Sequence, residues 1–109
     1  MAKLEFDDDF AALMEEFNIS AGATQRRKRI TAALGLKPGM HVLDVGSGPG
    51  HQAFELAQVV GSQGHVEGVD SAEGSVKIAR QRCSGLENVS FTLGDAYGLP
   101  YNTGTFDVA

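Results

Sequence analysis

Cysteine pairs, tryptophan and an excess of basic residues are all missing from this chain of 109 residues. No run approaches the roughly 18 apolar residues that a membrane-spanning helix needs, and the acidic residues 7–9 do not fit a secretion signal. Cys83 is the only cysteine, which excludes a disulfide within the chain and fits a reducing compartment. We therefore predict a cytoplasmic location and no membrane span.

Basic residues are outnumbered, with 9 lysines and arginines against 14 aspartates and glutamates and a net charge of −5. A protein that binds nucleic acid usually presents a basic stripe, so no nucleic-acid partner is predicted. The basic run at residues 25–29 is interpreted mainly as a solvated helix face. One of its members could reach an anionic group of a substrate, but the sequence alone does not identify which.

The first 35 residues predict helices. The apolar stripe of the first helix comprises Phe6, Phe10, Leu13, Met14 and Phe17. Residues 7–9, three aspartates, match the positive end of its dipole. After a break at residues 18–22, a second helix is expected over Thr24–Leu34, ended by Gly35. We treat residues 1–35 as an N-terminal helical segment.

Strand and helix patterns alternate from residue 36 to residue 109. The strands are expected at residues 41–45, 65–69 and 89–93, the helices at 52–60 and 73–84, and a fourth strand begins at 106–108. Short connections between such elements predict a parallel sheet. The predicted fold class is therefore α/β, a Rossmann-like doubly wound parallel sheet, partial, with about three to four strands and N-terminal helices.

Three glycines at alternate positions follow the first predicted strand: Gly46, Gly48 and Gly50. Glycine allows backbone angles closed to other residues and lets the backbone approach a ligand closely. The dinucleotide fingerprint places its third glycine one residue later, where His51 stands. Asp44, just before the loop, would repel a pyrophosphate and attract a cationic ligand. The loop therefore favours a positively charged cofactor.

Acidic residues also end the next two strands. Asp70 lies roughly 20 residues beyond the loop, the spacing at which a carboxylate meets ribose hydroxyls. Its alternative role is to cap the following helix, which Ser71 could do instead. Gly94-Asp95-Ala96 ends the third strand.

Residues 44–50 resemble motif I of class I S-adenosylmethionine-dependent methyltransferases, and residues 94–100 resemble the Gly-Asp-Ala-x-x-Leu-Pro segment of that family. The resemblance implies S-adenosylmethionine as cofactor, cradled by the three glycines with Asp44 facing its amino end. It also implies that Asp95 and Ala96 contact the adenine. The candidate cofactor-binding residues are Asp44, Gly46, Ser47, Gly48, Gly50, Asp70, Ser71, Asp95 and Ala96. No catalytic side chain and no metal ligand is predicted.

The resemblance is to the small-molecule branch that includes ubiquinone and menaquinone biosynthesis enzymes, and it implies methyl transfer to a small-molecule acceptor. Three alternatives remain: a nicotinamide-dependent dehydrogenase, which does not explain Asp44, an aminopropyl transferase, and a non-catalytic cofactor- or partner-binding fragment. The family domain has seven strands, so the resemblance also implies a domain truncated inside its fourth strand. A sheet edge exposed there predicts self-association or a completing chain.

Overall fold

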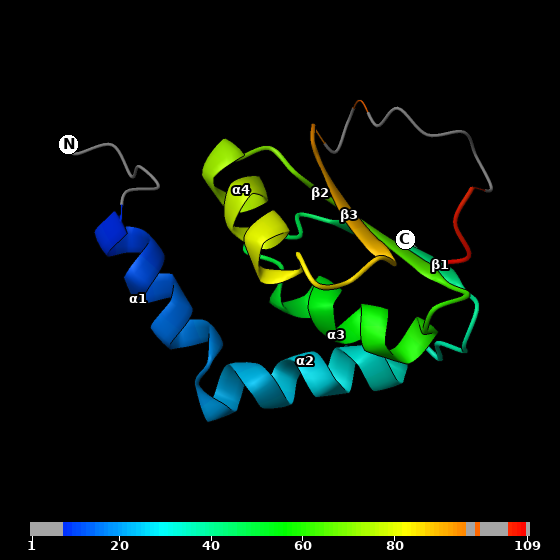
Figure 1. Cartoon of the computed structure of the whole chain (residues 1–109). Coiled ribbons are helices and arrows are strands. Elements are labelled where there is room, and N and C mark those ends of the chain that lie inside the picture. Colours follow the sequence, from blue (N-terminus) through cyan, green and yellow to red (C-terminus); the bar gives the residue numbers. More distant parts are fainter. Residues whose placement is uncertain (1–7, 96–97, 99–104, 109) are drawn as a thin grey trace.

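Four helices and three strands make up the described part of the chain, which in this computed structural model is residues 8–95, 98 and 105–108 (Figure 1). In chain order they are α1 (Asp8–Asn18), α2 (Ala21–Ala33), β1 (His41–Val45), α3 (His51–Val60), β2 (His65–Asp70), α4 (Glu73–Arg82) and β3 (Val89–Leu93). None of the described helices has the length and apolar character to cross a membrane.

The strands form a parallel sheet in the order β1-β2-β3, with Val42 opposite Val66 and Val66 opposite Val89. The other edge of β1 meets the fourth segment, where Val42 forms a parallel bridge with Val108. The Leu43 N–H donates a hydrogen bond of 2.8 Å to the Val108 carbonyl. The strand order therefore reverses at β1, and the predicted Rossmann-like parallel sheet is confirmed.

One face of the sheet packs against α3 and α4, with α2 lying outside α3 (Figure 1). The buried side of α3 repeats at helical spacing through Ala53, Leu56, Ala57 and Val60. These side chains join Val42 and Val66 in the core. Gly68 of β2 belongs to the same face, and a Cβ there would lie 2.4 Å from the Phe91 ring. The absence of a side chain at Gly68 therefore makes room for Phe91.

The opposite face of the sheet carries both apolar and polar side chains, and the polar ones lie on β2 and β3. Glu67 of β2 accepts hydrogen bonds from Ser90 and from Thr92 of β3, the latter at 2.5 Å. His65 lies beside them, with its Nε2 3.0 Å from the Ser90 hydroxyl. These contacts join β2 to β3 without apolar packing.

The second helix begins earlier than predicted. Ser20 is its N-cap, and the Ser20 hydroxyl accepts a hydrogen bond of 3.3 Å from the Ala23 N–H. The helix therefore includes Gly22 and begins three residues before Thr24, so the expected break at residues 18–22 is too long. Four other bounds differ by one or two residues: α2 ends at Ala33, α3 begins at His51, β2 ends at Asp70 and α4 ends at Arg82.

The attachment of α2 to α3 is polar, since none of the residues of α2 is buried. Arg27 Nε lies 3.0 Å from Glu55 Oε1 of α3. Gln52 of α3 donates a hydrogen bond of 2.9 Å to the Thr31 hydroxyl. The basic run is thus not uniformly solvated, because Arg27 is engaged between the two helices. Gly35, at a φ of 62°, follows the helix in the left-handed conformation predicted for it.

Candidate functional site

The carboxyl ends of β1 and β2 and the start of the chain after β3 meet at one edge of the sheet. A hollow of about 150 Å³ opens there, lined by Val45, Gly46, Val69, Asp70, Ser71 and Gly94. Ligands of open α/β sheets bind at this edge, where the strand order reverses. The fold therefore brings together the glycine loop, the second acidic strand end and the start of the third candidate segment.

Two glycines of the loop face open space. Gly46 has a φ of 71° and Gly48 a φ of 57°, both in the left-handed region that favours glycine. A Cβ placed on either would meet no atom within 4 Å. The loop is anchored from below, because the Gly46 N–H donates a 2.7 Å hydrogen bond to the Val69 carbonyl. A ligand can therefore lie directly against the backbone of Gly46 and Gly48.

Gly50 faces the protein instead. It is buried, and a Cβ on it would lie 3.0 Å from the Cβ of Ala79 on α4 and 3.4 Å from the Phe91 ring. The structure thus explains this glycine by the close approach of the loop to α4. The cradling role that the resemblance implies for Gly50 stays a prediction.

Asp70 connects the loop to the start of α4. Its Oδ2 accepts a hydrogen bond of 3.0 Å from the Gly48 N–H, and its Oδ1 accepts one of 2.8 Å from the Ala72 N–H. The alternative in which Ser71 caps α4 is wrong, because Ala72 is the N-cap residue and Asp70 supplies the carboxylate beside it. Each carboxylate oxygen has a further lone pair, so ribose binding by Asp70 stays a prediction.

Asp44 is the electrostatically unusual residue of the site. Its Oδ2 is buried and has no hydrogen-bond partner among the described residues. Burial, with a smaller contribution from the nearby Asp70 carboxylate, raises the pKa of Asp44 from 3.8 to about 6. A cation bound beside these two carboxylates would offset both effects, whereas a pyrophosphate would add to the repulsion. The site therefore fits a positively charged ligand.

The Ser47 hydroxyl is also buried and without a partner in the described part of the chain. It points toward β2, since a Cβ on Gly68 would lie 2.9 Å from it. Ser47 therefore fills the space beneath the loop.

The Asp44→Asn variant is expected to be more stable than the wild-type chain at pH 8. A carboxyl whose pKa is raised by folding binds its proton more tightly in the folded state, so wild-type stability falls as the pH rises through roughly 4 to 6. A shift of about two pKa units corresponds to at most about 3 kcal/mol in the free energy of unfolding.

Urea denaturation at pH 4 and pH 8 measures this difference. The gain of Asp44→Asn in the free energy of unfolding should be large at pH 8 and small at pH 4. Glu87→Gln, at an exposed carboxylate, should show no such pattern. Equal gains at both pH values would contradict the buried-charge explanation.

Asp95 follows β3 and is exposed, and its carbonyl accepts a hydrogen bond of 3.1 Å from the Gly98 N–H. Ala96 lies outside the described residues. The adenine contacts that the resemblance implies for both residues therefore stay predictions.

A second hollow, of about 290 Å³, lies on the other side of the glycine loop, between the loop and α1 and α2. Its lining residues are Phe17, Asn18, Ala23, Arg26, Arg27, Ile30, Gly46, Ser47, Gly48, Pro49, His51 and Gln52. The hollow thus shares Gly46 with the hollow at the strand ends. It places the N-terminal helices beside the ligand-facing loop.

Glu15 of α1 is a residue that sequence reasoning missed. Its Oε2 lies 2.9 Å from His51 Nε2 and 2.6 Å from Arg82 Nη2. Burial opposes ionisation of Glu15, but the hydrogen bonds from His51 and Arg82 outweigh it and lower its pKa. Arg82 also donates a 2.8 Å hydrogen bond to the Pro49 carbonyl in the glycine loop. Glu15 therefore connects α1 to the loop.

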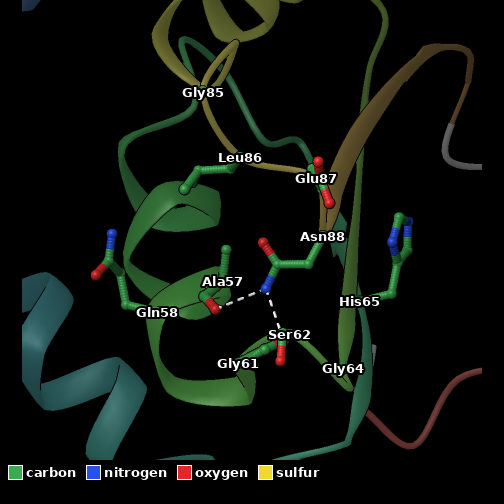
Figure 2. Close-up of a pocket in the computed structure, with 10 residues that line it drawn as sticks. All are labelled: Ala57, Gln58, Gly61, Ser62, Gly64, His65, Gly85, Leu86, Glu87 and Asn88. Carbon is green, nitrogen blue, oxygen red and sulfur yellow. Dashed lines mark hydrogen bonds between the residues drawn. The ribbon is translucent and has the colours of Figure 1, made fainter.

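A third hollow lies at the other end of the sheet (Figure 2). It measures about 530 Å³ and is lined by Ala57, Gln58, Gly61, Ser62, Gly64, His65, Gly85, Leu86, Glu87 and Asn88. The Asn88 amide points into α3 and donates hydrogen bonds of 2.9 and 2.8 Å to the carbonyls of Ala57 and Gly61. Asn88 thus caps the carboxyl end of α3. The hollow lies away from the glycine loop.

The parallel sheet, with its open glycine loop and two acidic strand ends, defines a Rossmann-like α/β ligand-binding domain. A family model described as a methyltransferase domain matches residues 36–109. The chain therefore belongs to the methyltransferase domain family.

Individual relatives agree with this assignment. The chain is 37% identical over 81 residues to a demethylmenaquinone methyltransferase of Staphylococcus aureus (strain MRSA252), a match that covers 74% of this chain and 34% of the relative. The chain thus spans about a third of the length of that relative.

Two solved structures share the fold. A SAM-dependent methyltransferase from Aquifex aeolicus superposes with a TM-score of 0.69 at 33% identity, covering 75% of this chain and 45% of that one. A SAM-dependent methyltransferase from Geobacter sulfurreducens, solved in complex with S-adenosyl-L-homocysteine, gives a TM-score of 0.61 at 31% identity. The match covers 72% of this chain and 32% of that one.

Proposed function

We propose that this chain carries the S-adenosylmethionine site of a methyltransferase that acts on a small-molecule acceptor. The observation that carries the proposal is the buried Oδ2 of Asp44, which has no partner among the residues that the structure describes, beside a glycine loop whose Gly46 and Gly48 face open space. A ligand with a cationic amino end and a nucleoside suits this combination of charge and exposed backbone. The Geobacter sulfurreducens relative, which was solved with S-adenosyl-L-homocysteine, supports the same ligand class.

In this proposal each candidate residue has a role that fits its position. Asp44 faces the amino end of the ligand, and the backbone of Gly46 and Gly48 lies against its methionine and ribose. Asp70, which already fixes the Gly48 N–H, accepts hydrogen bonds from the ribose hydroxyls with its remaining lone pairs. Gly50 and Ser47 support the loop from the protein side. Ser71 lines the hollow, and Asp95 and Ala96 take the adenine contacts.

The bound cofactor would supply a methyl group activated by a positively charged sulfur. The residues of this chain position that group and exclude water, which is the main contribution a protein makes to a displacement of this kind. We assign no side chain as acid or base.

The relatives support the class of acceptor. The Staphylococcus aureus relative is named for demethylmenaquinone, which supports a small-molecule acceptor. We also propose that the exposed apolar side chain of Leu13 on α1, at 61% exposure, is covered by a second copy or by a completing chain. Sedimentation of the chain over a range of concentrations tests this: a monomer at every concentration would contradict coverage by a second copy.

Calorimetric titration with S-adenosylhomocysteine, beside NADH as a control, tests the cofactor assignment. Binding of S-adenosylhomocysteine alone is expected. Because its ammonium group favours the ionised form of Asp44, the affinity should rise roughly tenfold between about pH 5 and pH 7. Protons should be released on binding in the lower part of that range.

The Asp44→Asn variant is the matched control, since it should bind more weakly and lose the pH dependence. Binding of NADH in preference to S-adenosylhomocysteine would overturn the proposal, and so would an affinity that falls with rising pH in the wild-type chain.

A further inference from the structure

The basic run on α2 separates into residues with different surroundings. Ala23, Arg26, Arg27 and Ile30 follow the spacing of one helix face and line the hollow of about 290 Å³ beside the glycine loop. Lys28 does not line this hollow. The hollow therefore receives two arginines of the run, whose environments can be compared directly.

Arg27 is already engaged by the protein. Its Nε lies 3.0 Å from Glu55 Oε1, its Nη1 donates a 2.8 Å hydrogen bond to the Asn18 carbonyl, and its side chain is only 12% exposed. The imidazole of His51, also in the lining, is paired with Glu15. Arg26 is exposed and forms no ion pair within the part of the chain that the structure describes. Arg26 is thus the cation of the hollow that remains available to a ligand.

The walls around Arg26 are apolar on the helix side. Phe17 is 57% exposed and Ile30 is 40% exposed, although both are large hydrophobic side chains. The opposite wall is the loop at Pro49 and the start of α3 at His51. An apolar surface with one available cation recognises a flat apolar molecule that carries an anionic group.

We propose that Arg26 is a specificity-determining residue that binds the anionic group, a carboxylate or phenolate, of an aromatic methyl acceptor seated between α2 and the glycine loop. The inference rests on the proposed function, because it needs the methyl donor bound next to this hollow, near Gly46, which lines both hollows. The planar guanidinium of Arg26 can hold a carboxylate with two parallel hydrogen bonds. Phe17 and Ile30 cover the apolar body of the acceptor.

A carboxylate at this place could also come from the methionine part of the cofactor. The apolar walls favour the acceptor, because a methionine zwitterion has no flat apolar body to cover. The two sources predict different effects of the same substitution, so one set of titrations distinguishes them.

The test compares 2-naphthoate with its neutral analogue 2-naphthamide, titrated into the full chain with and without saturating S-adenosylhomocysteine. The wild-type chain should bind naphthoate about tenfold more tightly than naphthamide, as expected for one charge-assisted pair. Arg26→Gln should remove this preference, and Lys28→Gln, an exposed control on the same helix, should keep it. The affinity for S-adenosylhomocysteine should be unchanged in both variants.

Several results would overturn the inference. These are equal binding of the two probes by the wild-type chain, binding of neither, or a preference that survives Arg26→Gln. An Arg26→Gln variant that loses affinity for S-adenosylhomocysteine would assign the arginine to the cofactor instead. Failure of the cofactor proposal has a separate signature, since the wild-type chain would then not bind S-adenosylhomocysteine at all.

Discussion

Replacing Asp70 with alanine is expected to weaken the binding of S-adenosylhomocysteine about hundredfold or more, because hydrogen bonds to a charged group contribute roughly 1.5–3 kcal/mol each and two are proposed to the ribose. The variant also loses the acceptor of the Gly48 N–H, which holds the loop in place. Calorimetric titration of the wild-type chain and the variant measures the effect. Glu87→Gln, which removes an exposed carboxylate at the opposite end of the sheet, should bind normally.

The two effects of Asp70→Ala can be separated with a ligand that lacks the ribose hydroxyls. The 2′,3′-dideoxy analogue of S-adenosylhomocysteine should bind the wild-type chain weakly, and Asp70→Ala should weaken it much less than it weakens the parent ligand. Such a coupling between residue and hydroxyls is what a double-mutant cycle detects. Equal losses for both ligands would show that Asp70 acts only by holding the loop and α4.

The Gly68→Ala variant is expected to lose about 3 kcal/mol in the free energy of unfolding, near the upper end for an overpacked core. The added Cβ would lie 2.4 Å from the Phe91 ring and 2.9 Å from the Ser47 hydroxyl. Phe91 is itself only 6% exposed, so the ring has little room to move. The shift of Ser47 should also displace the glycine loop and weaken ligand binding.

Urea denaturation measures the loss, with Gly85→Ala as the matched control. A Cβ on Gly85 meets nothing within 4 Å. The control should therefore stay within about 1 kcal/mol of the wild-type chain, or gain slightly from a less flexible unfolded state. If Gly68→Ala were as stable as the control, the close packing of Phe91 over β2 would be wrong.

The parts of the fold that depend on local pattern could be predicted from the sequence. The parallel order, the glycine loop after β1 and the acidic ends at Asp44 and Asp70 follow from alternating strand and helix signals and from the position of each acid after its strand. The position of Val108 beside β1 agrees with the predicted doubly wound class, in which the strand order reverses.

The remaining features depend on contacts between distant segments, which leave no local signal. Glu15 meets residues that are 36 and 67 positions away in the chain, and nothing around it distinguishes it from a solvated helix acid. The sequence of the motif does not distinguish Gly50 from Gly46 and Gly48. The structure shows that a Cβ on Gly50 would lie 3.0 Å from the Ala79 Cβ, toward the protein interior. Ser20, in contrast, carries an ordinary capping signal, and it lies within residues 18–22, where a break is predicted.

The capping of α3 by Asn88 has a consequence for the deamidation of the protein. Hydrolysis of that amide would turn a donor to two carbonyls into a carboxylate that faces the same two oxygens, and the end of α3 would be pushed away. Spontaneous deamidation requires the next backbone nitrogen to attack the side chain. Here that nitrogen belongs to Val89, which is β-branched and lies within β3. The same local sequence that places Asn88 is therefore expected to slow its deamidation.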